Sequence, residues 1–171
     1  DEGRKYLAPG LFGPCGYGLP SIVGAKIGQP LVPVVGFAGD GAFGIAVNEL
    51  TAIGRDEWPA VTQIVFRNYQ WGAEKRNSTL WFDDNFVGTE LDTKVSYAGI
   101  AQACGLLGVQ VKTMDELTAV LNQAIKDQME NNKTTVIEVI LNQELGEPFR
   151  RDAMKKPVQV AGVTAADMAA E

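Results

Sequence analysis

Histidine is absent from all 171 residues of the chain, and this absence excludes several kinds of chemistry. No Ser-His-Asp or Cys-His pair can be built, and no imidazole is available as a metal ligand or a proton shuttle near neutral pH. Cysteine is scarce too. Because Cys15 and Cys104 are the only two, a four-cysteine zinc site is excluded and at most one disulfide could form. Acid–base chemistry near pH 7 would therefore need a carboxylate, a lysine, a tyrosine or a bound cofactor.

Long apolar runs are missing as well. No stretch reaches the ~18 apolar residues that a membrane span needs. The charged segment 1–5 lacks the apolar core of a signal peptide, so we expect a cytoplasmic protein. The net charge of −6 disfavours nucleic acid or an anionic membrane as the main partner. Apolar residues make up 46% and charged residues 21% of the chain, proportions typical of a globular domain with a core of its own.

Short apolar runs alternate with helical patterns along most of the chain. We expect strands at 31–37, 61–66, 108–111 and 135–141, and helices at 19–27, 42–55, 96–104 and, with Thr113 and Glu116 as a capping box, 113–131. This alternation predicts an α/β fold, a three-layer α/β/α sandwich with a mostly parallel sheet. Residues 68–94 lack a regular period, and we expect an ordered, functional loop there. Residues 142–171 are predicted to form an extended tail.

A carboxylate and an amide follow two successive predicted strands. Gly39, Asp40 and Gly41 come after the first of these strands, and Asn68 comes after the second. Because ligands bind at the carboxyl ends of parallel strands, Asp40 and Asn68 are predicted to lie together at that edge. Their oxygens suit Mg²⁺ or Ca²⁺ rather than zinc or copper, and the Gly41 N–H at a helix start suits phosphate. The pattern predicts a metal-bridged diphosphate site, although Asp-Gly after a strand is also an ordinary turn.

Several motifs, in one order along the chain, resemble a known family. Residues 39–41 followed by Asn68 resemble the cofactor motif of thiamine-diphosphate-dependent enzymes. Glu-Leu-Thr-Ala at 49–52 resembles the helix that follows this motif in the acetohydroxyacid synthase branch. The run Gly-Pro-Cys-Gly-Tyr-Gly-Leu-Pro at 13–20 resembles the loop of that branch that holds the aminopyrimidine. The resemblance covers about residues 7–141 and implies the thiamine-diphosphate-binding fold of the C-terminal domain.

The resemblance also implies a role for each matching residue. The implied cofactor-binding residues are Gly13, Cys15, Gly39, Asp40, Gly41, Ala42, Asn68 and Gln70. Among them, the Asp40 and Asn68 side chains and the Gln70 carbonyl are the implied Mg²⁺ ligands. The Gly13 carbonyl would accept from the cofactor's 4′-amino group. Cys15 would take the place of the apolar residue that bends the cofactor, or it is simply a buried, inert small side chain.

Three positions depart from the pattern of the family. Arg67 stands where many relatives have a second asparagine, which leaves the implied ligand Asn68 intact. Ala42 replaces a frequent serine, so one hydroxyl contact to phosphate is lost. Cys15 is smaller than the usual methionine or isoleucine.

A closer resemblance is to the subgroup of this branch that converts sulfoacetaldehyde and phosphate into acetyl phosphate and sulfite. Residues 6–15, 67–75 and 144–151 carry it. It implies thiamine diphosphate and Mg²⁺ as cofactors and a homo-oligomer. The activating glutamate would come from the pyrimidine-binding domain of the same or a neighbouring subunit, which is absent from this sequence. We therefore expect a cofactor-binding domain at 1–141, followed by the tail, that is inactive alone.

Three other interpretations stay open on the residues alone. One is acetolactate synthesis from pyruvate, and another is a non-catalytic fragment or binding module. The third is dinucleotide binding at Gly36, Gly39 and Gly41. Their order differs from G-x-G-x-x-G, and the next strand ends in Arg67-Asn68 rather than in an acidic residue.

Overall fold

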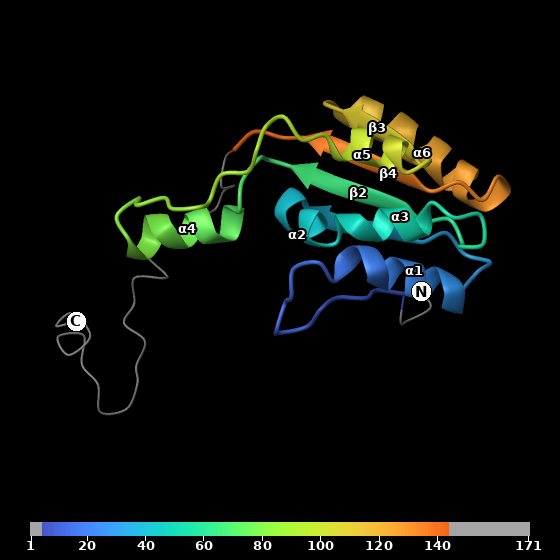
Figure 1. The fold of residues 1–171 in the computed structure, drawn as a ribbon, viewed down its shortest axis with the longest axis horizontal. Coiled ribbons are helices and arrows are strands. Elements are labelled where there is room, and N and C mark those ends of the chain that lie inside the picture. Colours follow the sequence, from blue (N-terminus) through green and yellow to red (C-terminus); the bar gives the residue numbers. More distant parts are fainter. Residues whose placement is uncertain (1–4, 144–171) are drawn as a thin grey trace. The chain divides into compact units, whose positions relative to one another are not determined.

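A computed structural model of the chain describes residues 5–143. Nearly all of the predicted tail, and the segment 144–151 that supports the closer resemblance, lie outside the described residues. A parallel sheet forms the centre of the fold (Figure 1). Its strands, in the spatial order β1-β2-β4-β3, are β1 (Val35–Gly39), β2 (Thr62–Arg67), β4 (Thr135–Ile140) and β3 (Leu107–Val111).

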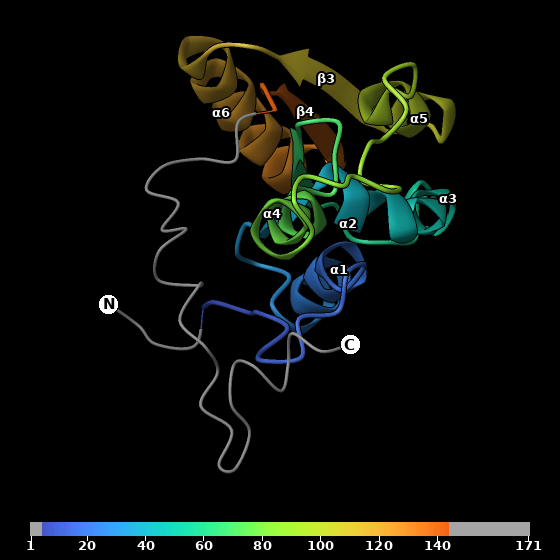
Figure 2. The same cartoon turned by 90° about the vertical axis from the view of Figure 1, so that its left-hand side faces the viewer.

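Helices cover both faces of this sheet, which confirms the predicted α/β/α layers. One layer consists of α1 (Gly18–Gly28), α2 (Asp40–Ile45), α3 (Leu50–Ile53) and α5 (Tyr97–Ala103). Helix α6 (Met114–Glu130) covers the opposite face; Figure 2 shows it across the sheet from α5 and α3. Strands that alternate with helices need such crossovers, because parallel neighbours cannot be joined by a hairpin.

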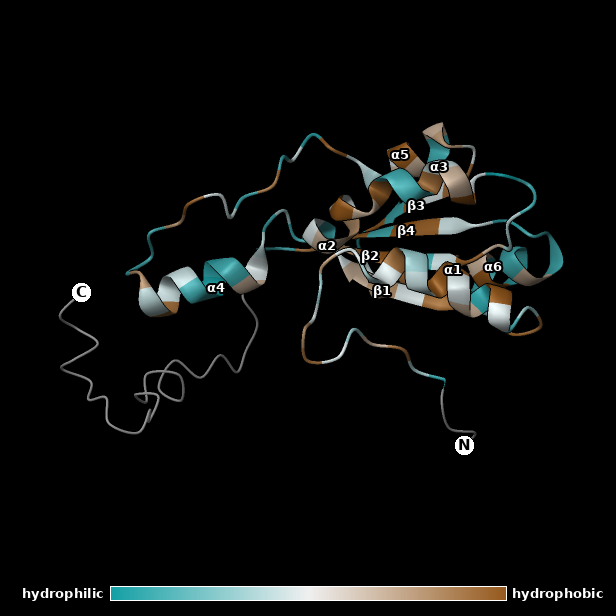
Figure 3. Cartoon of the chain, turned by 60° about the horizontal axis from the view of Figure 1, so that its bottom comes forward, coloured by the Kyte–Doolittle hydropathy of each residue, from teal (hydrophilic) through white to brown (hydrophobic). Residues whose placement is uncertain are grey.

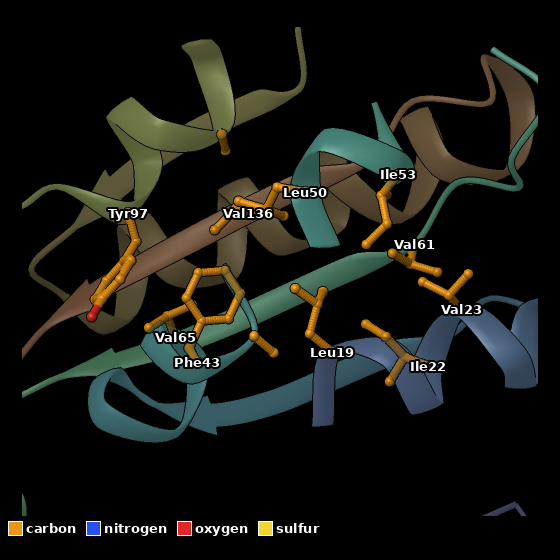
Figure 4. Packing of buried hydrophobic residues seen from close by; sticks show 12 residues of the cluster. Leu19, Ile22, Val23, Phe43, Leu50, Ile53, Val61, Val65, Tyr97 and Val136 are labelled. Atoms are coloured by element: carbon orange, nitrogen blue, oxygen red, sulfur yellow. The ribbon is translucent and has the colours of Figure 1, made fainter. Parts of the chain in front are cut away.

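Successive side chains of each central strand point to opposite faces of the sheet and enter two different hydrophobic clusters. Val65 and Val136 point into the cluster under α1–α3 and α5, where the Phe43 and Tyr97 rings meet edge to face at 5.1 Å (Figure 4). Their neighbours Ile64 and Ile137 point to the other face and pack under α6. Strands buried on both sides are usually rich in apolar residues, and Figure 3 shows hydrophobic residues in the central strands β2 and β4. Gln63, Arg67 and Glu138 are buried polar exceptions in these two strands.

Side chains close the amino ends of the first two strands. The Gln128 amide of α6 accepts from Val34 N and donates to Val34 O, each at 2.8 Å, and donates to the Thr62 hydroxyl at 3.0 Å. The buried Lys26 ammonium of α1 donates to the carbonyls of Pro30 and Val32. These bonds satisfy backbone groups just before β1, where the bond to β2 runs from Thr62 N to the Val34 carbonyl.

Two predicted elements have the wrong bounds. The strand expected at 31–37 begins only at Val35 and runs to Gly39, because the chain still turns before it and Lys26 holds the carbonyls of that turn. The helix expected at 42–55 begins at Asp40 and breaks into α2, a 3₁₀ turn η1 (Val47–Glu49) and α3. The break falls at Ala46, whose φ of −108° and ψ of 13° leave the helical range, after α2 has run through Gly41 and Gly44.

The segment predicted as a loop, 68–94, contains a helix, α4 (Gly72–Trp81). It belongs to a separate compact unit whose described residues are 71–89. Only Leu80 of this helix is buried, so no apolar stripe marked it in the sequence. Within this unit the Lys75 ammonium lies 5.2 Å from the centre of the Phe86 ring.

The remaining predicted helices and strands are confirmed, with bounds that differ from the prediction by no more than about two residues. Helix α5 is capped by the Ser96 side chain and is followed by Gly105, whose φ is +82°. Thr113 and Glu116 form the expected capping box of α6. Neither cysteine forms a disulfide. Across residues 5–143, no helix is both long enough and apolar enough to span a membrane.

Candidate functional site

The predicted edge of the sheet brings Asp40 and Asn68 together. Strands β1 and β2 pair in parallel with Gly39 opposite Phe66, so the residues that follow them share the carboxyl end of the sheet. Asp40 is the first residue of α2 rather than part of a turn, and it is 1% exposed. The interpretation of Asp-Gly as ordinary turn chemistry is therefore wrong.

Backbone and side-chain donors fix the Asp40 carboxylate. Its Oδ2 atom accepts hydrogen bonds from Tyr69 N at 2.7 Å and from Arg67 Nη1 at 3.2 Å. Its Oδ1 atom accepts from Gly41 N at 2.9 Å. The two oxygens thus face different partners, and only Oδ1 faces Asn68.

The Asn68 amide points one of its two terminal atoms at two oxygens. That atom lies 3.2 Å from Asp40 Oδ1 and 3.1 Å from the Gln70 carbonyl oxygen. With nitrogen there, the amide donates to both. With oxygen there, three oxygens face one another, an arrangement that is favourable only around a cation. The same side chain therefore suits both the metal-free and the metal-bound state.

The types of ligand at this edge suit a hard cation. Carboxylate, amide and carbonyl oxygens are the ligands that Mg²⁺ and Ca²⁺ take in proteins. Within the described residues, no group of three or more Cys, Asp and Glu side chains could hold a metal. A cation at this edge would therefore depend on amide and carbonyl oxygens.

The backbone at Tyr69 produces this convergence. Its φ is +61°, in the left-handed region that a large side chain rarely adopts. The bend directs Tyr69 N at Asp40 and the Gln70 carbonyl at the Asn68 side chain. A backbone bond from Leu91 N to Tyr69 O and a bridge between Gln70 and Glu90 hold the bend from outside. Strain maintained in this way is concentrated at functional sites.

Sequence reasoning missed the buried charges behind Asp40. Arg67 is 1% exposed; its Nη1 contacts Asp40 and its Nε lies 3.5 Å from Glu138 Oε1. Its Nη2 donates to the carbonyls of Asp92 and Val95. The available signal was a charge inside an apolar strand, at Glu138 in Thr-Val-Ile-Glu-Val-Ile, because a buried charge requires a partner.

Tyr97 was also missed as part of the site. Its hydroxyl donates to the Asp40 carbonyl at 3.0 Å, and its ring lies 5.0 Å from the Arg67 guanidinium carbon. Burial raises the pKa of Tyr97 above its usual value, so the hydroxyl remains a donor through neutral pH.

The other residues predicted for the site lie beside Asp40 in the chain or in the loop before α1. Gly39 and Ala42 flank the Asp40–Gly41 segment, and Gly41 N is already engaged by Asp40. Gly13 has φ +57° and is exposed, and Cys15 is exposed too, so the interpretation of Cys15 as a buried small side chain is wrong in this chain. Their loop reaches the site's helix through Gly16, where a Cβ atom would lie 2.9 Å from Ile45 Cγ2.

Comparisons with known proteins agree with this geometry. The chain is 80% identical over 168 residues to a sulfoacetaldehyde acetyltransferase of Roseovarius nubinhibens, covering 98% of this chain and 28% of that protein. It is 25% identical over 142 residues to acetolactate synthase isozyme 3 large subunit of Escherichia coli, covering 83% and 24%. The chain thus spans about a quarter of the length of these curated relatives.

Solved structures share the fold. A benzoylformate decarboxylase from Polynucleobacter necessarius superposes with a TM-score of 0.66 at 27% identity, covering 78% of this chain and 25% of that one. Residues 1–139 match the family described as "Thiamine pyrophosphate enzyme, C-terminal TPP binding domain". Since this match covers most of the sequence and the fold agrees with it, the chain belongs to the family of C-terminal thiamine-pyrophosphate-binding domains.

Proposed function

We propose that the chain is the cofactor-binding domain of an enzyme that transfers an acetyl group from sulfoacetaldehyde to phosphate and releases sulfite. The observation that carries the proposal is the meeting of the Asp40 carboxylate, the Asn68 side-chain amide and the Gln70 carbonyl at the carboxyl edge of the sheet. The substrate class is supported by the name of the relative that is 80% identical along nearly the whole chain.

The proposal assigns a role to each residue at the edge. Asp40 Oδ1, the Asn68 amide oxygen and the Gln70 carbonyl would hold Mg²⁺, which suits hard oxygen ligands. The backbone at Gly39, Gly41 and Ala42 would face the diphosphate at the start of α2. Releasing Gly41 N from Asp40 would free one donor for this purpose.

The exposed loop would contact the organic part of the cofactor. The Gly13 carbonyl would accept from its aminopyrimidine, and Cys15 would pack against its bent form. When bound, thiamine diphosphate supplies the carbon nucleophile and the internal base that a chain without histidine lacks. The residues of this chain bind and orient it.

Three further features belong to this proposal. Residues 1–141 form the cofactor-binding domain, and the activating glutamate comes from a pyrimidine-binding domain of the same or a neighbouring subunit. The complete enzyme is a homo-oligomer that acts in the cytoplasm. The chain spans 28% of the 80% identical relative, which is consistent with a site that is completed elsewhere.

The test is an assay of the complete gene product. Sulfite release from sulfoacetaldehyde should require phosphate, thiamine diphosphate and Mg²⁺ together, and acetyl phosphate should appear in equal amount. Formation of acetolactate from pyruvate with no sulfite release would refute the acetyl-transfer proposal and favour the carboligase alternative. A product that binds no thiamine diphosphate in the presence of Mg²⁺ would refute the site itself.

A further inference from the structure

A buried cation stands beside the proposed metal ligands, and the proposed function gives it no role. Arg67 is 1% exposed, and its Nη1 atom lies 3.2 Å from Asp40 Oδ2. Its plane is enclosed by two aromatic rings, with the Tyr69 and Tyr97 centres 4.4 and 5.0 Å from the guanidinium carbon. Since arginine stays protonated in proteins, this positive charge is permanent.

Holding the Asp40 carboxylate in place does not require Arg67. Tyr69 N approaches the same Oδ2 atom more closely, at 2.7 Å, and Gly41 N fixes Oδ1 at 2.9 Å. These two backbone donors already determine how the carboxylate is turned. At the carboxylate, what Arg67 adds beyond them is charge; its Nη2 atom is engaged elsewhere, with the carbonyls of Asp92 and Val95.

The balance of buried charges makes this addition important. Asp40 and Glu138 contribute two negative charges, and Arg67 contributes one positive charge between them. Glu138 is also satisfied by neutral donors, since its Oε2 accepts from Ser96 Oγ, Ala98 N and Gln110 Nε2. The other proposed ligands, from Asn68 and Gln70, are uncharged. A divalent cation would therefore meet one carboxylate, that of Asp40, whose charge is partly offset by Arg67.

We propose that Arg67 is a resident counter-cation that makes metal binding depend on the diphosphate. It lowers the attraction of the site for a free divalent cation, and only the negative charge of a diphosphate restores it. The proposal rests on the function proposed above. It deepens that function, because it assigns an order to loading: the metal enters with the diphosphate, not before it.

The test measures Mn²⁺ binding by the complete gene product from the electron paramagnetic resonance signal of free Mn²⁺, with and without thiamine diphosphate. Without the cofactor, Arg67→Gln should bind Mn²⁺ at least about tenfold more tightly than the parent, because the site loses a buried positive charge. Arg67→Lys, which keeps the charge, should stay near the parent. Arg55→Gln is the matched control: its side chain is 61% exposed and pairs with the Glu57 side chain, which is 67% exposed.

Damage to the fold would disperse the proposed ligands and weaken Mn²⁺ binding at this site, so the variant should gain affinity while keeping the circular dichroism spectrum of the parent. An Arg67→Gln protein that binds Mn²⁺ without cofactor no more tightly than the parent overturns the proposal. So does an Arg67→Lys protein that gains affinity as Arg67→Gln does. Failure of the parent to bind Mn²⁺ even with thiamine diphosphate refutes the proposed site itself, and the inference with it.

Glu138→Gln provides a second variant in case Arg67→Gln does not fold. It removes a negative charge from the other side of the guanidinium and leaves the Asp40 contacts in place. The proposal then predicts the opposite sign, with Mn²⁺ binding several-fold weaker than in the parent when the cofactor is absent. Unchanged or tighter binding by a folded Glu138→Gln protein contradicts it.

Discussion

At the scale of single residues, the site depends on one amide and one bent peptide. Tyr69 is held at positive φ so that its N–H meets Asp40 and the following carbonyl meets Asn68. The carboxylate itself is almost wholly enclosed by donors. A group so enclosed cannot be replaced by its neutral analogue without loss, because each donor was placed for an anion.

Asp40→Asn should therefore weaken Mg²⁺-dependent binding of thiamine diphosphate by about 100-fold or more, since even partners outside the first ligand sphere account for 10–100-fold. The exposed Asp56→Asn makes the same chemical change on the surface and should bind as the parent does. Titration calorimetry of the complete gene product with and without Mg²⁺ measures both. Equal affinity of Asp40→Asn and the parent would show that the carboxylate is not a ligand.

At the scale of elements, helix α5 lies unusually close to the sheet. A Cβ atom at Gly108 of β3 would overlap the Ala98 carbonyl, and one at Gly54 would overlap the Cys104 carbonyl. These two glycines let the helix backbone lie against its neighbours. The close approach also carries Tyr97 to within hydrogen-bonding distance of Asp40.

Gly108→Ala should displace α5 and lower the free energy of opening of its amides by at least about 2 kcal/mol, because no side chain can move aside to make room. Gly24→Ala is the control: nothing lies within 4 Å of its added methyl group in the exposed middle of α1, and it should raise helix stability by up to ~1 kcal/mol. Native-state hydrogen exchange resolves both helices. Full protection of α5 in Gly108→Ala would contradict the close contact.

The capping box of α6 offers a second element-scale prediction. Thr113 Oγ1 accepts from Glu116 N, so Thr113→Ala should cost about 1 kcal/mol in the exchange protection of the first turn. Thr118→Ala, in the exposed middle of the same helix, should change it by less than about 0.5 kcal/mol. Similar losses in both variants would show that the cap contributes nothing.

The same cap predicts a dependence on pH. Hydrogen bonds from the N–H groups of Lys112 and Thr113 lower the pKa of Glu116 below its usual 4.5. The folded state thus binds fewer protons than the unfolded state as the pH falls below 4.5. The stabilisation is complete above that pH and is lost as the pH falls through the lowered pKa. Glu116→Gln should remove this dependence from the first turn of α6.

Sequence patterns predicted some helices better than others. Helix α6 was predictable because its cap and its apolar stripe agree. The segment 42–55 has a helical apolar spacing as well, yet it folds as three short pieces, since apolar spacing does not reveal a change of backbone conformation such as the one at Ala46. Helix α4 was missed because a helix with one buried residue leaves no periodic signal.

At the scale of the whole molecule, the carboxyl and amino ends of the strands have different roles. The carboxyl ends of β1 and β2 carry the site, and the amino ends are closed by Gln128 and Lys26 from the two helical layers. Topology made the pair Asp40 and Asn68 predictable, because successive parallel strands bring their ends to one edge. Arg67 and Glu138 could not be paired in this way. Their contact requires β4 to lie next to β2 in the sheet, and the sequence does not show that spatial order.

Gln128→Ala tests whether the amino ends of the strands affect cofactor binding at the carboxyl ends. It leaves Val34 N without its acceptor, whereas the Val34 carbonyl keeps its bond from Thr62 N, so the start of β1 should lose about 1–2 kcal/mol of exchange protection. Affinity for thiamine diphosphate should remain that of the parent, because the site lies at the opposite ends of the strands. Gln123→Ala, which removes an exposed bond to Asp127, is the control and should change neither quantity. Loss of cofactor affinity in Gln128→Ala would show that the two ends are coupled.

The near-symmetry of the Asn68 amide has a practical consequence. Its oxygen and nitrogen fill almost the same volume, so half a turn exchanges a donor for an acceptor while the surrounding heavy atoms stay where they are. Crystals grown without metal should then admit Mg²⁺ and cofactor by soaking without cracking. In solution, the side-chain amide resonance of Asn68 would report loading, while the backbone resonances deep in the sheet stay unchanged.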